Sequence, residues 1–173
     1  GNDRIVAITA AMSVGTGLAN FSRRFPDRFF DVGIAEEHAV IFAAGMAARS
    51  FLPVVAVYST FAQRIVDYVI HDVCLQNLPV IFCLDRAGIV GDDGPTHHGL
   101  FDIALFRAVP GLVMMQPKDE PELAGMIAAA AAWKKPAMIR YPRGCGPGNP
   151  VPPEPAVIEF GKAEVITKGD AVQ

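Results

Sequence analysis

Short, continuously apolar segments alternate along the chain with longer segments in which apolar residues recur at helical spacing. The six short segments, interpreted as strands, are residues 4–10, 29–32, 53–58, 79–85, 112–116 and 136–141. The five helical segments are residues 15–24, 35–49, 61–76, 101–108 and 120–134. Continuously apolar strands are typical of a parallel sheet that is buried on both faces. The pattern therefore predicts an α/β fold: a doubly wound, mostly parallel six-stranded sheet with helices on both faces.

Two of the predicted helices start with a capping box, in which two side chains satisfy free backbone N–H groups of the first turn. The pairs that fit this motif are Thr60 with Gln63, and Asp119 with Glu122. We expect helices to begin directly after Thr60 and after Asp119.

The composition changes between Pro142 and Pro155, where fourteen residues include six prolines and three glycines. Such a segment is typical of a linker. We therefore expect one domain over residues 1–141, a linker over 142–157 that carries Arg143, and the truncated start of a C-terminal domain over 158–173. Residues 163–167 are interpreted as the first strand of that further domain, so that the chain is part of a longer polypeptide.

The charge balance and the length of the longest apolar run argue against two classes of partner. The 173 residues include 15 Lys and Arg against 18 Asp and Glu, a net charge of −3, which leaves no basic surface for a nucleic acid. The longest apolar run, residues 39–48, is about half the length of a membrane-spanning helix, so we expect no membrane association.

The three cysteines have no C-x-x-C spacing and no secretion signal is evident, which favours a cytoplasmic location.

Polar residues collect where the predicted strands end. Ligands of open α/β sheets bind beyond the carboxyl ends of the strands, because helix N-termini and free backbone N–H groups point there. The residues at these positions are Ser13, Glu36, Tyr58, Phe61, Arg64, the segment 86–98 and Arg143. We expect the functional site on this edge of the sheet.

Glu36 lies in the first turn of the most apolar helix, in the sequence GIAEEH of residues 33–38. In one interpretation, Glu36 and Glu37 only complement the helix dipole. In the other, Glu36 is a partly buried carboxyl whose pKa is raised by desolvation, so that it can hold or pass a proton. The pattern alone leaves both open.

Phe61, Arg64, Tyr68 and His71 follow one another at spacings of 3, 4 and 3, which places them on one stripe of a helix. Such a stripe usually packs against the core, with the arginine reaching solvent. Phe61 lies at the ligand edge, however, where its ring can instead stack on a flat heterocycle.

Residues 85–99 contain four glycines and one proline, which predicts a turn-rich loop of the kind that often carries function. Two aspartates and two histidines lie within residues 92–98, but adjacent histidines do not easily turn both rings to one ion, and no other ligand cluster completes a shell. A substrate loop is therefore favoured over a metal site, with an ordinary solvated loop as the alternative. The arginines near this edge are Arg64, Arg86, Arg140 and Arg143. Their planar guanidinium groups suit phosphate or carboxylate, which indicates an anionic substrate.

Three other functions compete at this point. Residues 15–20 (GTGLAN) resemble a dinucleotide-binding loop but lack its third glycine. Residues 11–15 (AMSVG), with Asp93 and His97 downstream, resemble a hydrolase nucleophile turn, but nothing upstream supplies an oxyanion hole. A non-catalytic dimerisation domain is the third alternative.

Five motifs in order add a family resemblance: residues 31–40 (DVGIAEEHAV), 58–64 (YSTFAQR), 85–88 (DRAG), 93–97 (DGPTH) and 140–144 (RYPRG). Together they resemble the central, pyrimidine-binding domain of the 1-deoxy-D-xylulose-5-phosphate synthases. That family is transketolase-like and depends on thiamine diphosphate. Transketolases and the β chains of 2-oxoacid dehydrogenases share the glutamate motif and are the closest alternatives.

The resemblance implies the thiamine-diphosphate-binding fold and a magnesium-dependent transferase. The whole enzyme would condense pyruvate with glyceraldehyde 3-phosphate to 1-deoxy-D-xylulose 5-phosphate and CO2, a step of isoprenoid-precursor and thiamine biosynthesis. In this family a separate N-terminal domain binds magnesium and diphosphate through a Gly-Asp-Gly motif, which this chain lacks. We therefore expect the chain alone to be inactive, with no metal ligands of its own.

The resemblance also implies residue roles. Glu36 and His97 would be catalytic, and Glu36, Phe61 and Ile34 would bind the cofactor. The substrate would contact Tyr58, Arg64, Arg86, Asp93 and Arg143. A homodimer would form largely through the helix of residues 35–49, in which Gly45 permits close helix contact.

Overall fold

The computed structural model describes residues 2–156, 158–167 and 169. Its six strands are β1 (Ile5–Thr9), β2 (Phe29–Asp31), β3 (Leu52–Tyr58), β4 (Ile81–Asp85), β5 (Val113–Met115) and β6 (Ala137–Arg140). They form one sheet in the order β2-β1-β3-β4-β6-β5, and every neighbouring pair is parallel. The six predicted strands and the doubly wound α/β class are therefore confirmed.

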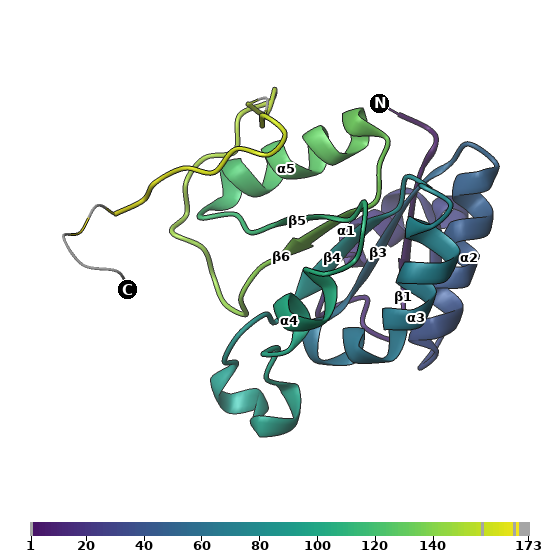
Figure 1. The fold of residues 1–173 in the computed structure, drawn as a ribbon, viewed down its shortest axis with the longest axis horizontal. Coiled ribbons are helices and arrows are strands. Elements are labelled where there is room, and N and C mark those ends of the chain that lie inside the picture. The colour runs from purple at the N-terminus through teal and green to yellow at the C-terminus, as the bar shows by residue number, and fades with distance from the viewer. Residues whose placement is uncertain (1, 157, 168, 170–173) are drawn as a thin grey trace.

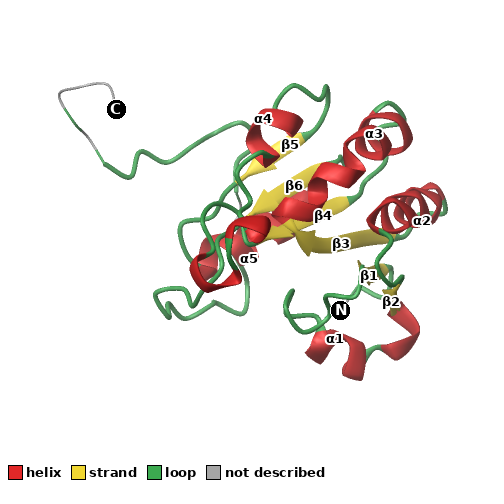
Figure 2. Cartoon of the chain, turned by 90° about the horizontal axis from the view of Figure 1, so that it is seen from below, coloured by secondary structure: helices red, strands yellow, loops and turns green. Residues whose placement is uncertain are grey.

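Helices cover both faces of this sheet. The helical elements are α1 (Ala19–Arg24), η1 (Pro26–Arg28), α2 (Glu36–Ala48), η2 (Ser59–Ile65), α3 (Val66–Tyr68), η3 (Val69–Cys74), η4 (Gly91–Asp93), η5 (Pro95–His97), α4 (Asp102–Phe106) and α5 (Glu120–Trp133). Helices α2, α3 and α4 lie on one face, and α1 and α5 lie on the other (Figures 1 and 2).

The central strands contribute to two cores, one on either face. On β4, Phe82 and Leu84 belong to the core beneath α2, η2 and α4, whereas Ile81 and Cys83 belong to the core beneath α5. Successive side chains of a strand point to opposite faces, so a sheet covered twice needs apolar residues at every position. This double burial explains the continuous apolar pattern of the strands.

The two predicted helix starts have different outcomes. Asp119 is the N-cap of α5, and its side chain accepts a hydrogen bond from the Glu122 N–H at 2.9 Å, as predicted. Thr60 instead lies inside η2, which begins at Ser59, and its hydroxyl donates to the Thr96 carbonyl at 3.1 Å. That prediction was wrong, because the hydroxyl is taken by a loop 36 residues further along the chain.

Two predicted helices are shorter or less regular than expected. The helix predicted at residues 15–24 begins only at Ala19, because Gly17 has a φ of +74° that interrupts helical backbone. The segment 59–74 is helical throughout but passes from 3-10 to α to π geometry. Such irregular helix is often found next to functional sites.

The segment after the proline-rich stretch lies against α5 rather than standing apart. Ile158 joins the core beneath α5, the rings of Phe160 and Trp133 meet edge to face at 5.2 Å, and Lys118 pairs with Glu164. Residues 163–167 lie outside the six strands of this structure. No helix among the described residues is long and apolar enough to cross a bilayer.

Candidate active site

The predicted site residues lie at the carboxyl edge of the sheet, around the point where the strand order reverses. The chain moves from β1 to β2 on one side and then crosses to β3 on the other. Such a switch point leaves a crevice at the carboxyl ends of the two diverging strands. Gly15 follows β1 and Tyr58 ends β3, and the two residues are so close that a Cβ at Gly15 would overlap the Tyr58 hydroxyl.

Glu36 begins α2 and is buried, with 3% of its side chain exposed. Its Oε1 accepts a hydrogen bond from Nη1 of Arg64, on η2, at 2.8 Å. The other oxygen, Oε2, has no hydrogen-bond partner within the part of the chain that the structure describes. The carboxylate is thus held in place by one oxygen and is available to a ligand through the other. The N-terminal end of α2 adds a favourable dipole.

The side chains of Tyr58, Phe61, His97 and Arg64 form a stack next to Glu36. The Tyr58 and Phe61 rings are nearly parallel at 5.9 Å, and the His97 ring meets Phe61 edge-on at 5.6 Å. The Arg64 guanidinium lies 4.9 Å from the centre of the Phe61 ring. Phe61 therefore lies at the centre of the stack, and Arg64 links the stack to Glu36.

Asp93 joins two arginines from distant segments. Its Oδ2 accepts a hydrogen bond from Arg86 Nε at 2.9 Å and forms an ion pair with Arg143, whose Nε lies 3.0 Å away. Arg86 also donates to the Gly15 carbonyl at 3.2 Å, and its guanidinium lies 3.8 Å from the centre of the Tyr58 ring. Arg86 also pairs with Asp85 at 3.5 Å, so two carboxylates balance the two arginines, and the guanidinium groups suit an anionic ligand that displaces one of these carboxylates.

Arg86 has an unusual backbone. Its φ of +61° lies in the left-handed region that side chains other than glycine rarely adopt. Two anchors surround it: the Ala87 N–H donates to the Tyr141 carbonyl at 3.0 Å, and Gly88 and Gly99 exchange two backbone hydrogen bonds at 2.8 Å. The strained residue thus stands at the closed neck of the 88–99 loop, as strained residues at functional sites often do.

A second carboxylate, Asp85, lies at the end of β4 beside this cluster. Burial raises its pKa above the ordinary value of 3.8, and the neighbouring Arg86 opposes the shift. Behind it on the same face, burial raises the pKa of the Cys83 thiol to about 12 and also raises that of Tyr141. Cys83 and Tyr141 therefore stay uncharged at neutral pH.

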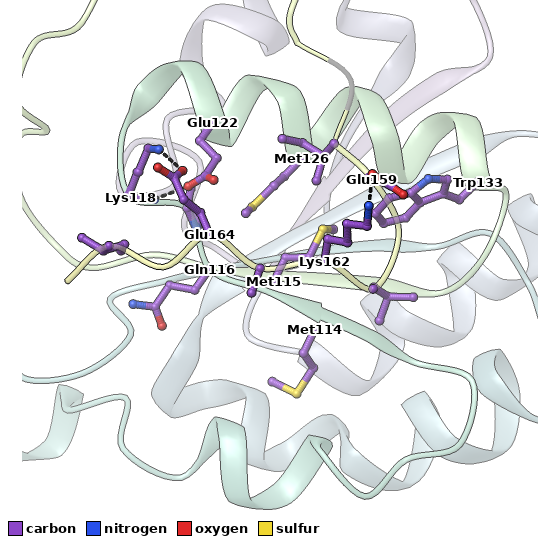
Figure 3. A pocket seen from close by; sticks show the side chains of 16 residues that line it. Met114, Met115, Gln116, Lys118, Glu122, Met126, Trp133, Glu159, Lys162 and Glu164 are labelled. Carbon is purple, nitrogen blue, oxygen red and sulfur yellow. Dashed lines mark hydrogen bonds and ion pairs between the residues drawn. The ribbon is translucent and has the colours of Figure 1, made fainter. Parts of the chain in front are cut away.

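A cavity of about 440 Å³ opens next to the arginine cluster. Its lining includes Asp85, Arg86, Lys118 and Arg143, and its volume falls in the range of small-molecule sites. The larger cavity of about 560 Å³ lies elsewhere, between β5, α5 and residues 158–166 (Figure 3). Methionines line it and ion pairs close its rim, and none of the predicted site residues contributes to it.

Most of the predicted site residues therefore come together, with one outlier. Glu36, Arg64 and Phe61 form one contiguous group with Tyr58 and His97, and Tyr58 connects it through Arg86 to Asp93 and Arg143. Ile34 is 82% exposed and lies outside this group. No set of three or more potential metal ligands occurs among the described residues.

Sequence reasoning missed three contributors to this edge. Gly15 places the Arg86 and Tyr58 side chains, Asp85 adds a buried carboxyl, and Asp102 binds Arg140 from a fully buried position. The signal for Asp102 was weak, because an acidic residue in the first turn of a helix ordinarily serves the dipole alone.

A comparison with known protein families assigns the chain to one of them. Residues 1–147 match the family described as "Transketolase, pyrimidine binding domain". The chain belongs to the transketolase pyrimidine-binding domain family. This assignment confirms the resemblance that the five motifs indicated and replaces the dinucleotide-binding and hydrolase alternatives.

Curated relatives of this family member share its sequence closely. It is 60% identical over 171 residues to the 1-deoxy-D-xylulose-5-phosphate synthase of Acidobacterium capsulatum, covering 99% of the chain and 27% of that protein. It is 62% identical over 168 residues to the synthase of Methylacidiphilum infernorum, covering 97% of the chain and 27% of that protein. The chain thus spans about a quarter of the length of these relatives.

Solved structures agree on the fold. A split-gene transketolase, described as an inactive β4 tetramer, has a TM-score of 0.79 and 28% identity, covering 97% of this chain and 54% of that one. A transketolase from Campylobacter jejuni has a TM-score of 0.75 and 20% identity, covering 86% of this chain and 24% of that one. The second likeness shows the fold alone.

Proposed function

We propose that this chain is the pyrimidine-binding part of a thiamine-diphosphate-dependent transferase that joins pyruvate to glyceraldehyde 3-phosphate. The products would be 1-deoxy-D-xylulose 5-phosphate and CO2. The observation that carries the proposal is the buried Glu36 carboxylate at the rim of the sheet, with one free oxygen, next to the Phe61 stack.

The chain's residues fit the pyrimidine end of that cofactor. Glu36 Oε2 is free to share a proton with a ring nitrogen, and Phe61 offers an aromatic surface. The Arg64 guanidinium now lies over the Phe61 ring, so a flat ligand there requires Arg64 to move aside, which its 45% exposed side chain allows. Ile34, just before α2, would contribute an apolar contact. When bound, the cofactor supplies the carbanion chemistry that side chains lack.

The arginine cluster fits the phosphorylated aldehyde. Arg86 and Arg143 would bind its phosphate, which would compete with Asp93 for their guanidinium groups. Tyr58 and Arg64 would shape this end of the site. Asp93 and His97 would contact hydroxyl or carbonyl groups of the substrate, with His97 positioned by its edge-on contact with Phe61 and able to move a proton.

The diphosphate and Mg²⁺ would be held by residues outside this chain, on an N-terminal domain of the longer protein. The described residues offer no cluster that suits the metal, and the relatives are about four times as long. We expect the chain alone to be inactive. Residues 158–173 would belong to the next domain, and the location would be cytoplasmic.

The exposed side of α2 supports a homodimer. Its residues His38, Ile41, Gly45 and Ala48 follow one another at helical spacing and are all exposed, so a stripe without Asp, Glu, Lys or Arg faces outward. Substituting Ile41→Lys should dissociate a dimer, whereas Ile127→Lys, on the exposed side of α5, should not. Light scattering that finds only monomer for the unsubstituted protein would contradict this part of the proposal.

A transketolase or a 2-oxoacid dehydrogenase β chain is the less favoured alternative. The curated relatives near 60% identity carry the synthase name, whereas the transketolase structures share 28% identity or less. The activities in those names belong to those proteins and serve here only as support.

The decisive experiment compares Glu36→Gln with Glu37→Gln in the full-length protein. Loss of a positioned proton-transfer group typically lowers the rate by a factor of about 100 to 10,000. We expect a fall of that size in kcat for Glu36→Gln with pyruvate and glyceraldehyde 3-phosphate, and a change of no more than about threefold for the neighbouring Glu37→Gln. An active Glu36→Gln protein would overturn the proposal.

A further inference from the structure

A buried ion pair lies next to the proposed site without belonging to it. The side chain of Asp102, the first residue of α4, is 0% exposed, and its Oδ2 accepts from Arg140 Nε at 2.7 Å. Its Oδ1 accepts from the Ile103 N–H at 2.8 Å. Arg140 ends β6 and also donates to the Gln116 side chain. Both carboxylate oxygens are therefore used, and three segments meet at one point.

The Asp102–Arg140 pair joins two segments of the chain that also meet at the proposed site. Asp102 follows the neck of the 88–99 loop, where Gly88 and Gly99 exchange backbone hydrogen bonds. Arg140 precedes Arg143 by three residues on the segment that leaves β6. The loop and this segment meet a second time where Asp93 contacts Arg143. The Asp102–Arg140 pair and the Asp93–Arg143 pair thus join the same two segments at separate points.

The energetics favour a positioning role over a stabilising one. Removing two charges from water costs about as much as their attraction returns, so a buried pair adds little net stability. Such a pair can nevertheless specify one arrangement, because any displacement leaves a buried charge unpaired. Asp102 is held from two directions, and it therefore fixes the start of α4 relative to the end of β6.

We propose that Asp102 is a positioning residue: through Arg140 it holds the exit of the 88–99 loop against the segment that carries Arg143. Asp93 is thereby kept between Arg86 and Arg143, at the distance where both guanidinium groups converge. The kinetic consequence rests on the proposed function, but the structural consequence does not.

The test uses the full-length protein with Asp102→Asn, which keeps the size of the side chain and removes its charge. The double variant Asp102→Asn/Arg140→Gln covers the case in which the single variant fails to fold, because it leaves no unpaired buried charge. The matched control is Val109→Ala, since Val109 is buried just beyond α4 and makes only apolar contacts in the same core. It loosens the packing near α4 and leaves the ion pair intact.

The first readout is amide hydrogen exchange at Gly88 and Gly99, the two residues of the loop neck. We expect exchange to be at least about tenfold faster in the Asp102 variants, and to change by less than about twofold in Val109→Ala at a comparable loss of melting temperature. Unchanged exchange in the Asp102 variants, or equal acceleration in the control, overturns the proposal.

The second readout is the KM for each substrate. Displacing a binding group weakens its interaction with the substrate. We therefore expect the KM for the phosphorylated aldehyde to rise about tenfold and the KM for pyruvate to change less than about twofold. Equal increases in both overturn the proposal. If the unsubstituted protein has no synthase activity, the proposed function fails, and the exchange result alone decides the role of Asp102.

Discussion

Glu36 and Arg64, 28 residues apart, form an ion pair in which one partner is buried and the other reaches solvent. The distance from Glu36 Oε1 to Arg64 Nη1 is 2.8 Å, and the exposed fractions of the two side chains are 3% and 45%. Removing Arg64 would leave a buried carboxylate without its cation. Its removal therefore tests how firmly the fold depends on this pair.

We expect Arg64→Gln to lower the free energy of unfolding by about 1–2 kcal/mol. A fully buried pair broken on one side costs about 3–5 kcal/mol, and the partial exposure of Arg64 reduces that cost. Urea unfolding followed by circular dichroism measures the change. Arg23→Gln removes an exposed arginine whose partner is Asn20 and should change stability by less than about 0.5 kcal/mol. Equal effects of the two substitutions would contradict the prediction.

The same substitution at two glycines should have opposite effects. At Gly15 a Cβ would overlap the Tyr58 hydroxyl, and overpacking of this kind destabilises by about 1 kcal/mol when a flexible side chain can shift. At Gly45, inside α2, a Cβ meets nothing within 4 Å of the single chain, and in the monomeric chain alanine stabilises a helix interior by about 0.8–1 kcal/mol relative to glycine. Unfolding free energies that shift in the same direction for Gly15→Ala and Gly45→Ala would refute the predicted contrast between the two positions.

The strands and the edge that carries the site could be predicted from sequence because their signals are local. Each buried strand is a continuous apolar segment, and the polar residues directly after β2, β3 and β4 must lie at one edge of a parallel sheet. The Asp119 cap could also be predicted, because the spacing of Asp119 and Glu122 is a local motif. The structure gives Asp119 the extended backbone that an N-cap requires, with φ −154° and ψ −179°.

The contacts between distant residues could not be predicted, because they depend on the strand order. Asp93 reaches Arg143 only because β6 inserts between β4 and β5, and no local pattern specifies that insertion. The contact of Asp102 with Arg140 has the same origin. Thr60 fits a capping motif in sequence, but its hydroxyl is taken by the Thr96 carbonyl, which only the folded loop brings near.

Asp85 should make the stability of the chain depend on pH. Burial raises its pKa in the folded chain above the ordinary 3.8, so the folded state retains the proton that the unfolded state loses. As pH rises through 3.8 toward the folded pKa, the wild type therefore loses stability, and above the folded pKa the loss is constant. Asp85→Asn has no such proton to lose.

The measurement is the free energy of unfolding of both proteins between about pH 3 and the neutral range, at about one-unit steps. The difference between Asp85→Asn and wild type should shift in favour of the variant as pH rises above 3.8. A difference that is independent of pH, or that shifts toward the wild type, would show that burial does not disfavour the ionised form of the Asp85 carboxyl. Asp92→Asn, on the exposed η4 turn, serves as the control for the loss of a surface carboxylate.

The three cysteines should react at very different rates in the folded chain. Cys145 is exposed, whereas burial raises the pKa of Cys74 to about 11 and that of Cys83 to about 12. Because the thiolate is the reactive form, iodoacetamide at neutral pH should label Cys145 rapidly and leave the other two thiols unmodified until the chain unfolds. Mass spectrometry of the labelled peptides separates the three sites. The substitution Cys145→Ser should abolish the rapid labelling, and rapid modification of Cys83 in the native chain would mean that the face of the sheet beneath α5 is open to solvent.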